Sequence, residues 1–238
     1  MVIDEELCIA CGQCVPYCPV KAITLDETAC IDLDECVECG NCLRMADCPV
    51  EAISRQELEW PRTVRSILSD PLTIATESGI SGRGTEEMKT NDVTGRFRRG
   101  DVGIGIEVGR PIVGARFRDV EKVAMAVATL GIEFEKINPT TSLMSDPEKG
   151  KFKEDILSEK VLSAILEFSV ALDRVPELFG VLKKVSQEID TVFSLCLISR
   201  LEQDGKIPVQ KYIHESGIWC APNGKNNVGL GRPLAQES

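Results

Sequence analysis

The second half of the chain alternates between strand-like and helix-like patterns of apolar residues. Apolar side chains at every second position, or in short unbroken runs, predict four β-strands: residues 102–109, 132–135, 162–170 and 191–200. Between them, apolar residues recur at helical spacing from Asp119 to Gly131 and again after Pro176. Strand–helix–strand repeated twice is the order of the split βαβ, ferredoxin-like sandwich. We therefore expect residues 102–203 to form four antiparallel strands with two helices on one side.

Residues 55–101 are much less apolar and are predicted to be a connector followed by an extended arm. In the connector, Val64, Ile67 and Leu68 are spaced for a short amphipathic helix that ends at Asp70-Pro71. From residue 78 onward, glycine and arginine alternate, with too few apolar residues to form a core of their own.

This Gly/Arg-rich arm carries the most basic part of the chain. Segment 83–118 has eight basic against five acidic side chains, and seven of the eight are arginines. Guanidinium groups are favoured where a carboxylate must be held at an interface. We expect the arm to order against a partner subunit; the competing account is that it folds back on the acidic part of its own chain. At the other end, residues 204–238 are expected to form an irregular C-terminal tail.

The first 54 residues are an internal repeat built around cysteines. Each half has an apolar lead-in, three cysteines spaced two residues apart, a fourth cysteine followed by proline, and a second apolar stretch. The cysteines are Cys8, Cys11, Cys14 and Cys18 in the first half and Cys36, Cys39, Cys42 and Cys48 in the second. We expect each half to form a short strand, a ligand loop, a one-turn helix and another short strand. The repeat thus predicts a separate domain over residues 1–54.

The spacing of the cysteines indicates the kind of metal site. Three thiolates separated by two residues each can wrap three corners of an iron–sulfur cube, which a tetrahedral zinc site does not require. Gly12 and Gly40 let each loop bend close to a cluster, so that backbone N–H groups can point at sulfur. Two zinc sites are the alternative explanation of the same cysteines.

This arrangement resembles the bacterial-type ferredoxins that carry two 4Fe–4S clusters. In that family the fourth cysteine of each run binds the other cluster. The resemblance therefore implies two 4Fe–4S clusters as cofactors, cluster one on Cys8, Cys11, Cys14 and Cys48, and cluster two on Cys36, Cys39, Cys42 and Cys18. The sequence departs from the family's commonest pattern by having five residues between Cys42 and Cys48. We expect this longer loop to lie near cluster one.

Acidic residues are concentrated in the same segment. The chain has 38 acidic and 27 basic residues and a formal net charge of −11, and residues 1–54 hold eleven of the acidic but only two of the basic ones. This balance argues against nucleic acid as a partner, because phosphate binding needs a basic face. The acidic surface either steers the module toward a basic docking face or simply keeps it solvated.

The distribution of apolar residues and cysteines bears on the compartment. No apolar run approaches the roughly 20 residues needed to span a bilayer, so no membrane insertion is expected. The N-terminus lacks the cationic and apolar regions of a secretory signal. Nine of the eleven cysteines fall in the first 48 residues, unlike those of a secreted disulfide scaffold. We therefore expect a cytoplasmic protein.

Three cysteines and the single histidine lie outside the two cysteine runs. Cys196 lies in an apolar strand and is expected to be buried, and Cys30 to pack beside the second ligand loop. Cys220 has either a redox or ligand role or none, and His214 is expected to be incidental. The glycines of segment 103–109 do not open a helix, so we favour close approach by a backbone or a flat surface over dinucleotide binding.

Together these features predict an α+β protein with an N-terminal two-cluster ferredoxin module, a Gly/Arg arm and a C-terminal sandwich. We expect the electron-transfer, iron–sulfur subunit of a multi-subunit anaerobic oxidoreductase, with no catalytic residue assigned. It would pass single low-potential electrons between a donor or acceptor protein and a catalytic partner subunit. Segment 83–92 resembles cluster-bearing proteins of anaerobic ring reduction, of the 6-hydroxynicotinate reductase type.

Two other functions are compatible with the same residues. One is a reductase with its own substrate pocket between the C-terminal sandwich and the cluster module. The other is a redox sensor or a cluster-assembly factor. Substrate turnover by the lone chain would distinguish the reductase from an electron-transfer subunit.

Overall fold

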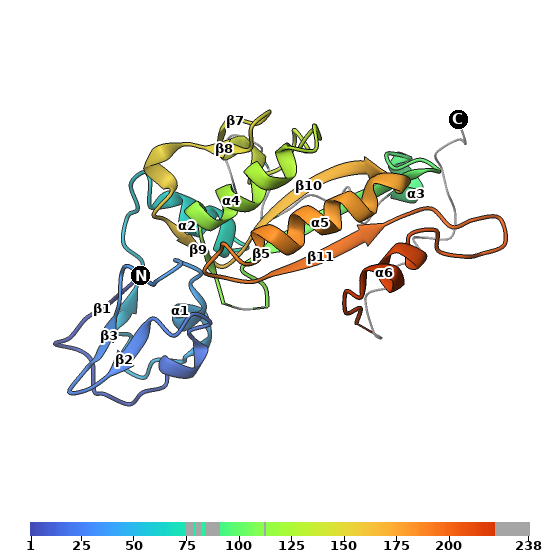
Figure 1. Ribbon diagram of the computed structural model, residues 1–238. Helices are drawn as coiled ribbons and strands as arrows, with labels where there is room; N and C mark the ends of the chain where they lie inside the picture. The colour runs from blue at the N-terminus through green and yellow to red at the C-terminus, as the bar shows by residue number, and fades with distance from the viewer. Residues whose placement is uncertain (75–78, 80–81, 84–90, 112, 222–238) are drawn as a thin grey trace.

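The computed structural model describes residues 1–74, 79, 82–83, 91–111 and 113–221. They form a mixed helix-and-strand structure in two parts, a small module at the N-terminus and a larger part built on a three-stranded sheet (Figure 1). Within these described residues, no helix is both long and apolar enough to cross a membrane.

The N-terminal module has the element order that the repeat predicts. Its strands pair antiparallel across the two halves, β1 (Val2–Ile3) with β4 (Ile53–Ser54) and β2 (Ile23–Leu25) with β3 (Ala29–Ile31). A short helix lies at the third cysteine of each run: the 3-10 helix η1 (Val15–Tyr17) begins directly after Cys14, and α1 (Asn41–Met45) contains Cys42. The small core of the module consists of apolar residues such as Ala22 and Ile53 together with cysteine side chains.

The larger part is organised around strand β5 (Asp101–Val108). It pairs antiparallel with β10 (Ala164–Ala171) on one side and β11 (Phe193–Ile198) on the other. Helices α4 (Phe117–Ala128) and α5 (Val175–Val185) contact each other and cover one face of this sheet (Figure 1). The fully buried core between sheet and helices includes Ile104, Ile106, Phe168, Val123 and Leu178.

The predicted strand 132–135 is reduced to a single bridge, so the expected four-stranded sheet has three strands. Phe134 pairs with Phe168 of β10, and the Glu135 N–H donates to the Glu167 carbonyl at 2.8 Å. Beyond this point Asn138 turns the chain away, because its side-chain oxygen accepts from the Thr140 N–H at 2.7 Å. The bridge lies beside β10, where the sandwich places its second strand, but the pairing is too short to form one.

The polar stretch between the two halves contains small elements of its own. After the 3-10 helix η3 (Thr141–Leu143), strands β7 (Met144–Asp146) and β8 (Lys151–Phe152) form a hairpin. The 3-10 helix η4 (Glu154–Ile156) leads to β9 (Lys160–Val161), which pairs with β6 (Ala115–Arg116). The Phe152 ring packs edge-on against Phe117 of α4, with centroids 5.1 Å apart, so this insertion extends the core.

The connector helix is present and the described arm residues contact their own chain. Helix α2 (Thr63–Ser69) ends at Asp70, as predicted. Short helix α3 (Asn91–Thr94) precedes Arg96, which is hydrogen-bonded and ion-paired to Glu135. Arg99 donates to the Leu201 carbonyl. These contacts are with the larger part of the chain, whereas residues 84–90, most of the segment that resembles ring-reducing proteins, lie outside the described residues.

Gly103 in β5 and Gly109 just after this strand are each approached closely by other atoms, as the sequence suggests. A Cβ on Gly103 would lie 2.7 Å from the Phe97 ring, which is a flat surface. A Cβ on Gly109 would lie 2.9 Å from the backbone of Gly114. The segment therefore serves packing at both positions.

The tail expected to be irregular contains a helix. After the 3-10 helix η5 (Leu172–Arg174) and α5, the chain returns through β11 to α6 (Gln210–Ser216). Tyr212 and Ile213 of α6 pack against the core of the larger part, which gives this segment a reason to be ordered. Gly217 ends the helix in the left-handed region, at φ 64°.

Candidate metal centres

Two cavities in the N-terminal module are each lined by four cysteines. The first, of about 330 Å³ counted to its open mouth, is lined by Cys8, Cys11, Cys14 and Cys48. The second, of about 310 Å³, is lined by Cys18, Cys36, Cys39 and Cys42. We call them site one and site two. Each brings together three cysteines of one run with the fourth of the other, the two sets that the ferredoxin resemblance implies.

Strand pairing explains how each fourth cysteine reaches the other run. The pairing of β1 with β4 continues as a hydrogen bond from the Asp4 N–H to the Ala52 carbonyl at 2.8 Å, which carries Cys48 toward the first loop. In the same way, the Asp32 N–H donates to the Ala22 carbonyl at 2.8 Å, which brings Cys18 beside the second loop. The crossover therefore follows from long-range pairing and not from the spacing within either run.

The loops themselves bend through left-handed residues at matching positions. Gly12 and Gly40 have φ of 72° and 69°, and the non-glycine residues Ala10 and Glu38 both have φ of 55°. Such conformations are uncommon for residues with a Cβ. Their repetition in both halves shows that the two loops share one backbone shape around their cavities.

The chemistry of the linings fits iron–sulfur clusters. Each cavity presents four sulfur donors within mainly apolar walls, and thiolates are the usual ligands of 4Fe–4S clusters. Backbone N–H groups already point at sulfur, from Ala22 to Cys18 Sγ at 3.1 Å and from Ala29 to Cys8 Sγ at 3.4 Å. No group of three or more Cys, His, Asp or Glu side chains in the described ranges is arranged to hold a metal ion. The assignment of clusters therefore depends on the two cavities, in each of which four cysteines line a space large enough to be filled by a bound group.

Burial affects the protonation of these thiols. Desolvation raises the pKa of Cys14, Cys36 and Cys39, and it raises the pKa of Cys42 to about 11. Metal ligation needs the thiolate, so the incoming metal must displace protons from thiols that hold them firmly.

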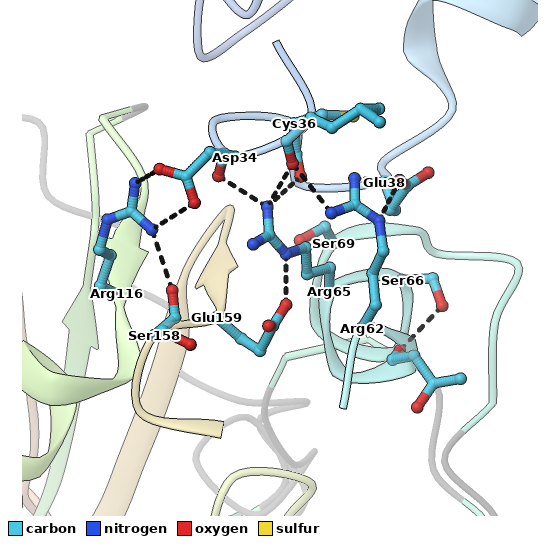
Figure 2. Close-up of polar contacts among 12 residues, drawn as sticks. Asp34, Cys36, Glu38, Arg62, Arg65, Ser66, Ser69, Arg116, Ser158 and Glu159 are labelled. Carbon is cyan, nitrogen blue, oxygen red and sulfur yellow. Dashed lines mark hydrogen bonds and ion pairs between the residues drawn. The ribbon is translucent and has the colours of Figure 1, made fainter. Parts of the chain in front are cut away.

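Site two lies against the larger part of the chain through basic side chains. Arg65 of α2, only 3% exposed, donates from Nη1 to the carbonyls of Leu33, Asp34 and Cys36 at 3.1, 2.7 and 2.8 Å, and it pairs with Glu159. Figure 2 shows this guanidinium between the ligand loop and Glu159. The loop leading to Cys36 is thereby held from outside the module.

Three further basic residues extend this contact. Arg62 binds Glu38 at 2.6 Å and Arg116 binds Asp34 at 2.7 Å (Figure 2). Arg116 also binds Glu35 at 2.7 Å. Lys160 also pairs with Glu35. The hydrogen bond from Arg116 keeps the pKa of the Asp34 carboxyl below its usual value. Arg116 belongs to the basic segment 83–118, so that part of the segment does fold back on the acidic module.

The longer loop between Cys42 and Cys48 contacts both sites. Ala46 lines site one, as expected for a loop near the first cluster. Arg44, on α1, instead donates to the Cys39 carbonyl of site two at 2.6 Å. Sequence reasoning missed Arg44, Arg62 and Arg65; the signal available was basic residues within and after a strongly acidic segment.

The remaining candidates lie away from the two cavities. Cys196 is exposed on β11, and the prediction that it is buried is wrong, because it stands opposite Gly105 on the sheet face away from the helices. Cys30 is exposed on β3 opposite Thr24, so the expected packing beside the second loop is not found. Cys220 is exposed, and His214 is exposed in the last turn of α6.

Comparisons with known proteins agree on the N-terminal segment. Residues 1–24 match the family described as 4Fe-4S binding domain. A ferredoxin of Pyrobaculum islandicum is 44% identical over 63 residues, which are 26% of this chain and 57% of that protein. No solved structure matches.

Two pyruvate synthase subunits PorD are also similar to part of the chain. The protein of Methanocaldococcus jannaschii is 41% identical over 54 residues, 23% of this chain and 63% of its own. That of Methanothermobacter marburgensis is 39% identical over 54 residues, 23% of this chain and 62% of its own. The chain thus spans less than two thirds of each of these curated relatives, and its N-terminal segment is of the ferredoxin 4Fe–4S type.

Proposed function

We propose that this chain is the electron-transfer subunit of a multi-subunit anaerobic oxidoreductase. In this role it passes single low-potential electrons between a donor or acceptor protein and a catalytic partner subunit. The observation that carries the proposal is the pair of four-cysteine cavities within a ferredoxin-type segment. Site one would hold cluster one on Cys8, Cys11, Cys14 and Cys48, and site two would hold cluster two on Cys36, Cys39, Cys42 and Cys18.

Each bound cluster would supply a centre that accepts and releases one electron. The residues of the chain bind the clusters and control their surroundings. The cysteines bind iron, the apolar walls limit water, and the N–H groups of Ala22 and Ala29 stabilise negative charge on sulfur.

The surface beside site one supports a protein partner. Leu7, Ile9 and Leu25 are 50%, 60% and 45% exposed, and Ile9 lines the cavity with Cys11, which is itself exposed. Leu25 lies against Gly12 of the first loop. Acidic residues flank them in the chain, Glu5-Glu6 and Asp26-Glu27. An apolar patch with an acidic rim is suited to a protein that presents basic residues around an apolar centre.

Similar proteins support a role among several subunits. Two of the relatives bear the name of a pyruvate synthase subunit, which belongs to an assembly with further subunits. We extend to this chain only the general role of an iron–sulfur subunit with protein partners. A cytoplasmic location is part of the same proposal, because thiolate-bound clusters persist in a reducing compartment.

Anaerobic isolation of the protein from its host tests the proposal. We expect about eight iron atoms per chain, as two 4Fe–4S clusters require, and a co-purifying subunit that carries another cofactor. The isolated chain should accept electrons from dithionite and turn over no substrate. Substrate reduction by the lone chain would favour the reductase alternative, and zinc in place of iron would overturn the cluster assignment.

A further inference from the structure

The two sites differ in the charges that touch their ligand loops. In site two, Arg44 donates to the Cys39 carbonyl at 2.6 Å and Arg65 to the Cys36 carbonyl at 2.8 Å. Both guanidinium groups come from outside the loop between these cysteines. Among the described residues, the carbonyls of the first loop, Cys8 to Cys14, accept no hydrogen bond from an arginine. Within the described part of the chain, arginine side chains therefore contact the ligand-loop carbonyls of site two but not those of site one.

Arg44 is held in place over the second loop. Its Nη1 binds Asp70 at 3.1 Å, and Arg55 pairs with the same carboxylate, whose side chain is 0% exposed. A Cβ on Gly40 would lie 2.6 Å from Arg44 Nη1 and 2.9 Å from Arg55 Nη2. Two guanidinium groups thus cover Gly40, between Cys39 and the helix that contains Cys42. The φ of 69° favours glycine there, and a Cβ would displace the ends of the two arginine side chains.

The arrangement of charged side chains around site two favours the reduction of a cluster bound there. The Arg44 guanidinium lies between the second ligand loop and Asp70, because one of its nitrogens faces the Cys39 carbonyl while another faces the Asp70 carboxylate. Arg65 likewise faces Cys36 with Nη1 and Glu159 with Nε. Positive charge beside a cluster stabilises its reduced state, whereas exclusion of water opposes reduction. Arg44 and Arg65 thus offset the unfavourable effect of burial on the reduction of a cluster in site two.

We propose that Arg44 is a positioning residue that raises the reduction potential of cluster two, with Arg55 assisting it through Asp70. The inference depends on the proposed function, since it requires a cluster on Cys18, Cys36, Cys39 and Cys42. It also assigns a role to the longer loop of the second run, which supplies Arg44. Reduction adds one electron from a partner or a chemical reductant to the cluster, and no bond is made or broken in the protein.

An anaerobic redox titration of the full chain with dithionite, followed by electron paramagnetic resonance, tests the proposal. The Cys18→Ser variant identifies which signals belong to site two. In Arg44→Met, we expect the midpoint potential of site two to fall while site one and the iron content stay as in the wild type. Arg44→Lys should recover part of the shift, because it keeps the charge but not the two-pronged geometry.

Arg174→Met is the matched control. Arg174, the last residue of η5, pairs with Glu177 and donates to the Leu130 carbonyl at 3.0 Å. It contacts neither ligand loop, and the N-terminal end of α5 that follows it lies at the end of the sheet away from the module (Figure 1). Its loss removes one arginine without a change near either site, so both potentials should stay unchanged. Unchanged potentials in Arg44→Met, with full iron content, would overturn the proposal.

A second variant covers the case in which Arg44→Met loses iron from site two. Arg55 is 44% exposed at its side chain and binds Asp70 but no ligand carbonyl, so Arg55→Met should keep the cluster. We expect a smaller fall in the potential of site two in this variant, and no fall would overturn the proposal. A wild-type chain that binds no iron would instead contradict the proposed function itself, which is a different result.

Discussion

Arg65 donates a hydrogen bond from Nη1 to the carbonyl oxygen of Cys36 at 2.8 Å, across a sequence separation of 29 residues. The same nitrogen binds the carbonyls of Leu33 and Asp34, while Nε pairs with Glu159 (Figure 2). One buried side chain therefore joins helix α2, the second ligand loop and the segment before β9. The position of this ligand loop depends on residues far outside the cysteine repeat.

Substitution of Arg65 should destabilise the chain strongly. In Arg65→Met, Glu159 loses its partner, and the carbonyls of Asp34 and Cys36 lose the arginine that donates to them, whereas the Leu33 carbonyl keeps a donor in Arg62. We therefore expect the free energy of unfolding to fall by about 3 kcal/mol. Urea denaturation followed by the fluorescence of Trp60, just before α2, measures this. Arg174→Met removes the exposed ion pair with Glu177 and one hydrogen bond to the Leu130 carbonyl, and it should cost only about 1 kcal/mol. Equal losses in the two variants would contradict the role of Arg65.

The crossed ligand sets make a specific prediction for Cys18. In Cys18→Ser, we expect loss or alteration of the cluster held by Cys36, Cys39 and Cys42, while the cluster of the first loop keeps its spectrum. Iron analysis and electron paramagnetic resonance measure the two separately. Cys30→Ser and Cys196→Ser should leave the iron content unchanged, since both cysteines are exposed and line neither cavity. Loss confined to the first-loop cluster would refute the crossed assignment.

Removal of the clusters should unfold the module selectively. The core of residues 1–54 is small and includes the side chains of Cys14, Cys36 and Cys42, so metal binding and folding are coupled there. After iron is removed with ferricyanide and a chelator, hydrogen exchange should show lost protection in β2 and β3. Protection in β5 and β10, in the core of the larger part, should persist. Unchanged protection throughout would show that the module folds without metal.

The buried carboxylate of Asp70 predicts a pH-dependent contribution to stability. Burial raises the pKa of Asp70, but hydrogen bonds from Arg55 and the Leu72 N–H, with the charges of Arg55 and Arg44, leave that pKa below its usual value of 3.8. The charged form is therefore favoured by folding. Its stabilisation is complete above about pH 5 and is lost as the pH falls through the lowered pKa.

Comparison of the wild type with Asp70→Asn checks this sign. The difference in their unfolding midpoints should be large at pH 6 and should shrink toward pH 3; iron loss common to both chains cancels. Asp173→Asn, an exposed carboxylate, serves as the control and should show little difference at any pH. A difference between wild type and Asp70→Asn that grows as the pH falls would be the wrong sign.

Gly103 and Gly180 form a matched pair for the packing of the sheet. A Cβ at Gly103 meets the Phe97 ring at 2.7 Å, whereas a Cβ at Gly180 in α5 meets nothing within 4 Å. We expect Gly103→Ala to destabilise the chain by about 1–3 kcal/mol through overpacking. Gly180→Ala should stabilise it by about 0.5–1 kcal/mol, because alanine is the better helix former. Thermal unfolding measures both, and a stabilising Gly103→Ala would show that Phe97 moves away freely.

Most of what the sequence predicted came from the spacing of residues that are close together in the chain. Cysteines two residues apart indicate loops that wrap a cluster, and alternating apolar residues indicate β5, β10 and β11, because both patterns follow from the geometry of a few neighbouring residues. The helices after Asp119 and Pro176 were predictable for the same reason. The expected strand 132–135 is reduced to one bridge and the described part of the tail contains α6; neither could be read from local spacing, because the pairing of Phe134 and the docking of α6 depend on distant partners. Residues 222–238 of the expected tail lie outside the described residues.

The sequence by itself determined the donor chemistry of this protein: eight cysteines in two matched runs, in an acidic module with a ferredoxin-type repeat. Only the tertiary structure decided how the two halves exchange Cys18 and Cys48, and that Arg44 and Arg65 reach the carbonyls of site two but not those of site one. The reason is physical. Ligand type is a property of side chains, whereas the neighbours of a loop depend on strand pairing and packing between residues far apart in the chain.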